Sequence, residues 1–495
     1  NQRKTSSMKK AIFILSFFIG IQALNANEVI TNRITLAKHY KTESTFSGNL
    51  SKENSFHLIF TKNKKTKNFE VFSYLFDGQN ILSLAPILSE KSYGVVSFHQ
   101  KDAVLSLILS YKKKRKTYIK RIDYNLTTKV KSESEAIPHN DFLTSIRQKE
   151  QSILIYKDKE TFSVLSFTGN QPAVQKDIRF QKKSDKLKAF FKNKSVSSIK
   201  TDEFVANGAT NEVRLYFEEN TLYFTKDSDV AIPVSIAGFQ LNNKKENTTQ
   251  TLKIDLSKAI LSPSFSVFNN AGEKKFKKRT SFYAKNRLYQ LGLSKKAGQV
   301  QVSDMSLGKP LNTISLDASL STYIKGNEQF LGVEKFLKNA GKNKHNVTIT
   351  ANQTNTDKVR LRVDYVDITY SYNYNWWWHH HFMMQHQQMM LNQQIRTSIP
   401  SGFGPTNDTG VPVGYFKVSK EKRFFELLID VNGMLSNEDL PDLVYKEIDK
   451  KQFIDTLEDV PNYTMESSCF LEDSFRFIAY EKKQKVFIIQ TNSIK

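Results

Sequence analysis

The residues best suited to binding chemistry lie within one run, Tyr370 to Ile395. It holds the chain's three tryptophans, four of its nine histidines and four of its eight methionines. Residues 368–395 carry no formal charge, although charged residues make up 25% of the chain. From Trp376 to Gln394 there is no glycine, proline or β-branched residue, and methionine and glutamine favour helix. We therefore expect a helical segment that departs from the rest of the chain.

As a helix, this run would place two histidines and two methionines on one stripe, because side chains three and four positions apart share a face. These residues are His379, Met383, His386 and Met390. Imidazole and thioether ligands together suit soft Cu(I). The run resembles the His/Met-rich tracts of periplasmic copper- and silver-handling proteins. That resemblance implies a site for Cu(I) or Ag(I), and no other cofactor is expected.

The other side of the helix predicts a contact surface for a partner. Trp378, Phe382 and Met389 fall on that side, and Trp376 and Trp377 complete the set of candidate contact residues. A methionine stripe at helical spacing is typical of a buried helix or of a soft partner-binding surface. Interfacial membrane contact through the tryptophans is an alternative, and a disordered polar tract is another. We predict that these five side chains bind a protein or a component of the cell envelope.

Catalytic motifs are missing from the sequence. It has no Gly-x-Ser-x-Gly, no His-Glu-x-x-His and no phosphate-cradling glycine loop. The remaining histidines share no spacing, and we expect them to be strand or loop residues: His39, His57, His99, His139 and His345. We predict that the protein is not an enzyme. A glycan-acting propeller enzyme is the alternative, because its residues would come from separate blades.

The elements that must position the run are short strands. Runs of β-branched and aromatic residues alternate with polar turns, as in Phe69 to Leu75 closed by Asp77-Gly78. Three or four such runs recur about every 40 to 50 residues, the period of a propeller blade. Over Phe56 to Ile489 the architecture resembles that of divergent bacterial secreted β-propellers. We predict an all-β, β-propeller-like fold with short helical insertions; the alternative is two tandem β-sandwich domains split near residues 180–210.

Three further expectations concern the order of these elements. Residues 370–413 should form an insertion between a strand at Val359 to Tyr370 and the next strand near Tyr415. The short amphipathic helices should span Glu328 to Ala340 and Leu440 to Leu457. The last strand, Lys485 to Gln490, should pair in a sheet that also contains an early strand, because ring closure commonly uses both ends of the chain.

The beginning of the sequence predicts export. Lys9 and Lys10 precede an apolar run that ends at Ile21, and Ala26 follows at a cleavable position. Residues 8–26 thus resemble the signal peptides of Gram-negative bacteria, which leaves 27–495 as the propeller-like domain. The apolar run is too short to span a bilayer, which needs about 20 residues. We expect a periplasmic or extracellular protein without a transmembrane span.

The formal net charge of +24 would suit an anionic partner. The lysines cluster where turns are expected, at 62–67, 112–116 and 274–278. Lysine at such positions prevents edge-to-edge association of strands, and no nucleic-acid-binding motif accompanies the charge. We therefore predict no nucleic-acid partner. The sequence favours an exported, non-enzymatic binding or scaffold protein of the bacterial envelope, with a soft-metal-binding protein as the alternative.

Overall fold

The structure is a computed structural model that describes residues 30–494 with several gaps. The gaps are 115, 140–141, 182–184, 193–195, 202, 206–212, 237–238, 270–275, 326–329, 344, 371–413, 418–423, 449–452, 454–456 and 458–459. Only the backbone is described for Ile30 and for residues 228–247, 366–370 and 414–417. The structure is 61% strand and 6% helix. Soluble proteins average about 20–25% strand, so the all-β prediction is confirmed.

The strands form seven sheets, six of which follow one another along the chain. The first three sheets contain β2 (Tyr40–Asn49), β3 (Ser55–Asn63), β4 (Phe69–Phe76) and β5 (Ile81–Ser89); β6 (Gly94–Lys101), β7 (Val104–Lys113), β8 (Lys116–Asn125), β9 (Lys131–Glu133) and β10 (Ile137–His139); and β11 (Phe142–Arg147), β12 (Gln151–Lys157), β13 (Thr161–Thr168) and β14 (Val174–Arg179). Consecutive strands pair antiparallel in the first and third sheets, and in the second sheet β9 and β10 both pair with β8. Antiparallel pairing of strands that are neighbours in the chain is the pattern of propeller blades.

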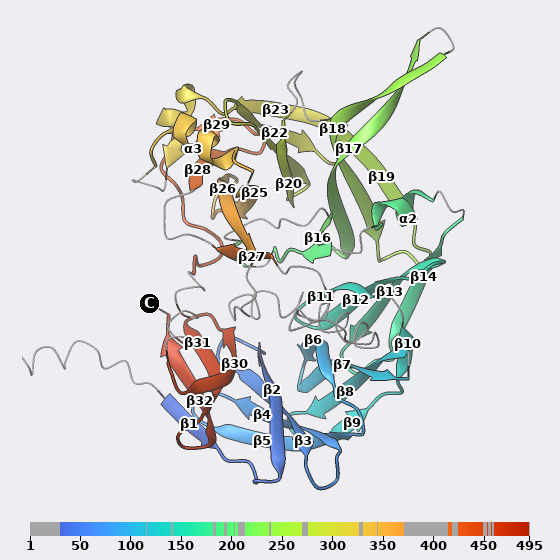
Figure 1. Cartoon of the computed structure of the whole chain (residues 1–495), viewed down its shortest axis with the longest axis vertical. Coiled ribbons are helices and arrows are strands. Elements are labelled where there is room, and N and C mark those ends of the chain that lie inside the picture. Colours follow the sequence, from blue (N-terminus) through green and yellow to red (C-terminus); the bar gives the residue numbers. More distant parts are fainter. Residues whose placement is uncertain are drawn as a thin grey trace, which may run out of the picture. The chain divides into compact units, whose positions relative to one another are not determined.

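The remaining sheets continue this order. They contain β15 (Val196–Ser198), β16 (Val213–Glu218), β17 (Thr221–Ile236), β18 (Phe239–Asp255) and β19 (Pro263–Asn269); β20 (Lys278–Ala284), β21 (Arg287–Leu293), β22 (Gly298–Asp304) and β23 (Lys309–Ser315); β24 (Ile324–Lys325), β25 (His345–Gln353), β26 (Val359–Tyr370), β27 (Gly414–Lys417), β28 (Phe424–Ile429) and β29 (Leu435–Ser436); and β1 (Ile30–Ile34), β30 (Tyr463–Phe470), β31 (Ser474–Glu481) and β32 (Val486–Ser493). Figure 1 labels most of these strands. The β-propeller-like prediction is confirmed.

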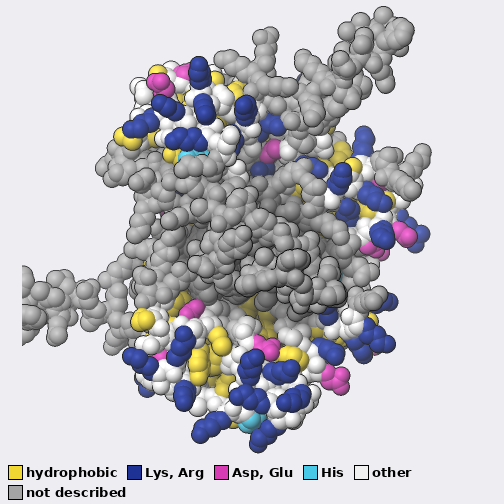
Figure 2. Space-filling view, in the orientation of Figure 1, with side chains coloured by type: hydrophobic (Ala, Val, Ile, Leu, Met, Phe, Trp, Pro, Cys, Tyr) yellow, Lys and Arg dark blue, Asp and Glu magenta, His cyan; other side chains and the backbone are white. Residues whose placement is uncertain are grey.

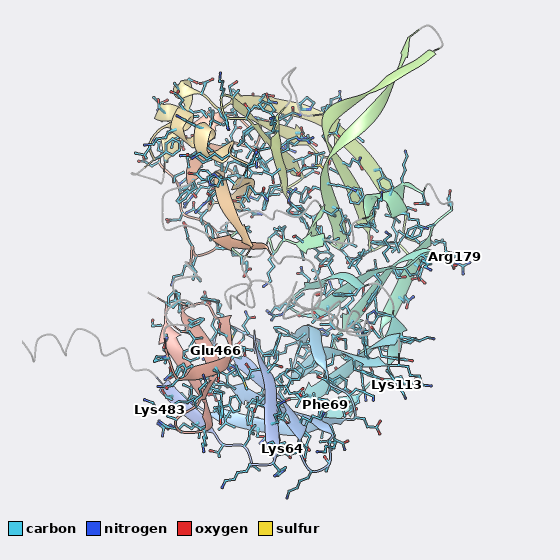
Figure 3. The ribbon with its side chains drawn as sticks, in the orientation of Figure 1. Lys64, Phe69, Lys113, Arg179, Glu466 and Lys483 are labelled. Atoms are coloured by element: carbon cyan, nitrogen blue, oxygen red, sulfur yellow. The ribbon has the colours of Figure 1, made fainter. Side chains whose placement is uncertain are left out.

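Local sequence explains the hairpin turns. Asp77 Oδ1 accepts hydrogen bonds from the backbone N–H groups of Gln79 and Asn80, while Gly78 takes a φ of +102°. Such a turn needs a short acceptor side chain followed by a residue that tolerates positive φ, as the Asp-Gly pair predicts. Lysines also lie at the hairpin ends, as expected. Lys64 projects from the β3–β4 turn, and Lys113 lies at the end of β7 (Figure 3).

The strands divide into two compact units. The first comprises Asn1–Tyr93, Tyr124–Ser132 and Asp449–Lys495, and it contains the first sheet and the sheet of β1, β30, β31 and β32. In the latter sheet, β1 pairs with β32 from Ile30 opposite Thr491 to Ile34 opposite Phe487. The predicted pairing of the last strand with an early one is confirmed. Tandem sandwiches would have kept the two ends of the chain in separate sheets.

The second unit, Gly94–Asp123 and Glu133–Ile448, contains the third to sixth sheets and most of the second. Its largest apolar core joins the fourth, fifth and sixth sheets and includes Tyr216, Phe282, Leu361 and Phe425. A second core packs the third sheet on the fourth and includes the helix α2 (Lys186–Phe190), whose Phe190 is buried. Neighbouring sheets therefore bury their faces against one another in chain order.

The first helical prediction is confirmed from Val333 onward, although residues 330–332 are not helical, and the second is wrong over residues 440–448. The helix α3 (Val333–Ala340) buries Val333, Phe336 and Leu337 as expected, and a 3-10 helix η1 (Ala318–Thr322) precedes it. Residues 440–448 are not helical. There the Val444 N–H donates to the Gln353 carbonyl, and Leu443 bridges to Thr354. Pairing with an existing hairpin satisfies backbone groups that the sequence pattern assigned to a helix.

Within residues 30–494, apart from the gaps, no helix is long and apolar enough to cross a membrane. The proposed signal peptide, residues 8–26, lies outside the described residues.

Truncation tests the pairing of the two chain ends. Removal of residues 485–495 deletes β32, so β1 and β31 lose the strand between them. Two exposed edges in place of a paired strand should lower the melting temperature on the order of 10 °C or abolish cooperative unfolding. Thermal melts followed by circular dichroism measure this, with removal of Lys495 alone as control. A protease-resistant fragment ending near residue 200 in the truncated protein would contradict the propeller-like assembly.

Candidate functional site

The segment that the sequence singles out is inserted between two paired strands of the sixth sheet. Tyr370, the last residue of β26, pairs with Gly414, the first residue of β27. The strands predicted on either side of it are present, at Val359–Tyr370 and Gly414–Lys417. The candidate partner and metal residues lie outside the described residues: Trp376, Trp377, Trp378, His379, Phe382, Met383, His386, Met389 and Met390. The structure therefore describes the scaffold that carries them.

That scaffold contains a cross-strand ion cluster. Arg362 on β26 stands opposite Glu426 on β28, and Arg360 Nη2 lies 2.7 Å from Glu426 Oε2. Both arginines also approach Glu447, at 3.4 and 3.5 Å. The Glu426 side chain is only 2% exposed, and burial raises its pKa although the two arginines oppose that shift. Two cations around one buried carboxylate fix the register of β26 on β28, directly before the insertion.

Two buried histidines occupy a repeated Ser-Phe-His sequence. In the first unit, His57 on β3 has its Nδ1 2.8 Å from Ser47 Oγ and its Nε2 3.0 Å from Ser55 Oγ. Arg476 on β31 donates to that same Ser55 hydroxyl at 2.8 Å. Ser47 also lies 2.9 Å from Ser467 Oγ on β30. Hydrogen bonds to a buried imidazole thus join the first sheet to the terminal sheet.

The second copy of the sequence lies in the second unit. His99 on β6 has its Nδ1 3.0 Å from Ser152 Oγ on β12, and Ser97 donates to that same hydroxyl at 2.8 Å. On β8, Arg121 Nε donates to Asp123 at 2.9 Å, and its Nη2 donates to the Asn170 carbonyl at 2.8 Å. These bonds join the second sheet to the third. The five side chains named in this paragraph are each less than 9% exposed.

The buried histidines are structural groups. Burial, with the charge of Arg476, lowers the pKa of His57 to about 3. Burial lowers the pKa values of His99 and His139 to about 4. The expectation that the isolated histidines are strand or loop residues is confirmed: His57, His99, His139 and His345 lie in strands and His39 lies in the turn before β2. Sequence reasoning missed the networks, although the repeated Ser-Phe-His at 55–57 and 97–99 was the signal.

A small cavity lies near the ends of β16, β20 and β25, which belong to three successive sheets. Its volume is about 40 Å³, room for about two or three water-sized groups. The strands β16, β20 and β25 contribute Glu218, Phe282 and Asn352. Its other lining residues are Thr201, Glu203, Val205, Ala284, Lys285, Ala351, Gln353 and Tyr445. Sequence reasoning missed this cavity, because its walls come from positions separated by more than 200 residues.

Two contacts shape the cavity. Asn352 Oδ1 accepts from the Val205 N–H at 3.0 Å, and its Nδ2 donates to the Val205 carbonyl at 3.1 Å. This amide clamp holds the segment after β15 against β25. Tyr283 donates to Glu218 Oε2 at 2.7 Å, and burial together with that carboxylate raises the pKa of Tyr283. Glu218 is thereby fixed at the wall as a hydrogen-bond acceptor.

The lining combines two carboxylates with one ammonium group, two amides and a phenol. Such a site accommodates a small group rich in hydrogen-bond donors, for example the ammonium or guanidinium of a partner's side chain. Among the described residues, no three or more His, Cys, Asp or Glu side chains gather in a way that could hold a metal ion. Figure 2 shows the lysines and arginines dispersed over the described surface of one face, with no single basic patch.

Comparisons with known proteins find similar solved structures but no matching sequence. No family model and no curated protein matches the sequence. Among solved structures, the chain is similar to the WD40 domain of SCAP from fission yeast, with 6% identity, a TM-score of 0.27, and coverage of 94% of this chain and 98% of that one. It is also similar to the propeller domain of the Trilobed protease from Pyrococcus furiosus, with 7% identity, a TM-score of 0.24, and coverage of 67% and 94%. The fold of this chain is assigned from its own strand pairing.

The buried histidines predict an acid-sensitive fold. Their folded pKa values lie below the usual value of about 6.5, so the unfolded chain binds more protons between those limits. The stability that the neutral, buried imidazoles contribute to the fold is fully present above about pH 6.5 and is lost as the pH falls below that value. Between about pH 7 and pH 4.5, each should lower the free energy of unfolding by on the order of 2 kcal/mol. Denaturant unfolding at both pH values should show a smaller loss for His57→Gln than for wild type, whereas His39→Gln should keep the wild-type loss.

The amide clamp of the cavity gives a second test. Asn352→Leu leaves the N–H and carbonyl of Val205 without the side chain that pairs both. We expect a loss of about 2 kcal/mol in unfolding free energy and faster hydrogen exchange at the Val205 amide. Gln353→Leu is the matched control and should change stability by less than about 0.5 kcal/mol. Unchanged exchange at Val205 in the Asn352 variant would show that the clamp does not hold this segment.

Proposed function

We propose that this chain is an exported, non-enzymatic binding protein whose propeller-like sheets present residues 371–413 to a protein or envelope partner. The observation that carries the proposal is the strand pairing around the insertion. On one edge of β26, β27 pairs with residues 367–370 and β28 pairs with residues 359–364. The ladder is therefore formed by residues outside the insertion. A sheet whose strands pair without the inserted residues can carry a long insertion between them.

The ion cluster of Arg360, Arg362 and Glu426 supports the same proposal. It stabilises the pairing of β26 with β28 without any residue of the insertion. The composition of the insertion supports a contact role, because three adjacent tryptophans with methionines on a surface would be an aggregation liability unless a partner covers them. Export, which residues 8–26 predict, favours a partner in the cell envelope.

Deletion of the segment tests the proposal. Replacing Trp376 to Gln394 by a short Gly-Ser linker should leave the melting temperature within about 2 °C, since the sheet pairs without it. The same deletion should abolish binding to an envelope fraction of the source cells, measured with purified protein at equilibrium. A variant that unfolds would show that the segment is part of the core. A folded variant that still binds would show that the contact lies elsewhere.

All three tryptophans lie at 376–378, so tryptophan emission reports on this segment alone. In the intact protein, quenching by acrylamide should decrease when the envelope fraction is added, because the partner covers the indoles. A Cu(I) competition titration separates partner docking from metal binding. Replacement of His379, Met383, His386 and Met390 together should lower Cu(I) uptake if the stripe is a metal site, and should leave it unchanged if the segment only docks.

A further inference from the structure

The last strand of the fourth sheet, β19, has one open edge. It pairs with β18 without a register shift, from Thr248 opposite Asn269 to Ile254 opposite Pro263. Among the described residues, no strand pairs with its other edge, and its backbone bonds to no backbone group beyond β18. Figure 1 shows β19 beside α2. An open edge presents a row of N–H and carbonyl groups that a further strand can pair with.

Comparable edge strands carry residues that oppose strand addition, and β19 does not. In the first and fifth sheets, the last strands β5 and β23 contain Pro86 and Pro310, and β14 of the third sheet contains three charged residues. The sequence of β19 is Pro-Ser-Phe-Ser-Val-Phe-Asn, which has no charge and has its one proline at the first position. Proline and charge are the usual means by which an edge avoids pairing. The edge of β19 therefore remains available to another strand.

The two faces of β19 differ in chemistry. Phe265 and Val267 lie on one face, since positions two apart on a strand share a face. The Phe265 side chain packs against the core that joins the third and fourth sheets, whereas Val267 is 58% exposed. Ser264 and Ser266 lie on the other face, and both are exposed. A strand added at this edge would therefore bury apolar side chains on the first face and place polar ones on the second.

Charges near the serine face favour an acidic partner. The exposed Lys253 on β18 pairs with Ser264 and so lies on that face. Lys258 is exposed in the segment that leads into β19, and Lys176 Nζ donates to its carbonyl at 2.8 Å. Asp255 is the one carboxylate between Lys253 and Lys258 in the chain. Because the whole chain carries a formal charge of +24, a second copy would be repelled and an acidic segment attracted.

We propose that β19 binds, by strand addition, an extended segment of another protein in which apolar and acidic side chains alternate. The 7 residues of β19 give a strand about 23 Å long, along which the backbone of the partner pairs. Its apolar side chains lie beside Phe265 and Val267, and its carboxylates lie on the side of Lys253. The proposal is independent of the 371–413 insertion.

Titration of the full chain with a blocked heptapeptide that alternates glutamate and valine, with valine at its centre, tests this. Bound peptide should slow hydrogen exchange at the outward-facing amides within residues 264–268 about fivefold or more. Val267→Glu should weaken binding about tenfold, because a charge replaces the apolar contact on that face. Lys253→Glu should also weaken it, and salt should weaken binding to the wild type. Val174→Glu, at a 53% exposed position of the β14 edge, is the matched control and should bind as wild type.

A second peptide, with proline in place of the central valine, should bind about tenfold more weakly, because proline cannot donate along the edge. Equal binding of the two peptides, or equal binding by wild type and the Val267 variant, would overturn the proposal, as would no binding at all. Self-association that Val267→Glu abolishes, without peptide binding, would assign the edge to a second copy and also overturn it. The variant that lacks Trp376 to Gln394 should bind the peptide as wild type; loss in that variant alone would place the contact on the insertion instead.

Discussion

The pairing of β1 with β32 is the constraint on which the terminal sheet depends. A strand with an unpaired edge exposes a row of backbone donors and acceptors, and seven short sheets multiply that exposure. The chain limits it by placing its first described strand beside its last. The same unit joins this sheet to the first one through side chains, since Ser467, Ser47 and His57 form a continuous hydrogen-bonded series. Backbone pairing closes the sheet, and buried polar groups attach it to its neighbour.

Buried polar side chains form hydrogen bonds between neighbouring sheets. His57 and His99 are both fully buried, and each is bound by serine hydroxyls. A buried imidazole without such partners would be costly, whereas a satisfied one restricts the packing to a single arrangement. Arg121 and Arg476 act in the same way by donating to carbonyl groups at strand ends. Because hydrogen bonds are directional, these networks select which sheet packs against which. Aliphatic contacts are not directional and select less strictly.

In two sheets, the chain departs from the sheet at the connection between two paired strands. In the sixth sheet this connection holds residues 371–413, and in the fourth sheet β17 and β18 simply continue past their neighbours. In each case the same strands also pair with neighbouring strands of the sheet, which stabilises them. The cavity of Glu218 and Asn352 lies instead near the ends of β16, β20 and β25. The paired strands thus form the scaffold, and the candidate binding residues lie at strand connections and strand ends.

The sequence by itself determined the blade-like period of the strands, the Asp77-Gly78 turn, the α3 helix and the two strands that flank residues 371–413. These follow from local rules, because alternation, turn chemistry and helical spacing are set by residues close together in the chain. Only the tertiary structure decided that residues 440–448 pair with the β25–β26 hairpin, that Ser47 binds His57, and that Glu218, Lys285 and Asn352 share one cavity. Those contacts join distant positions, and no spacing in the sequence encodes them. The extension of β17 and β18 also needed the structure, since a ribbon is recognised by where its neighbours stop.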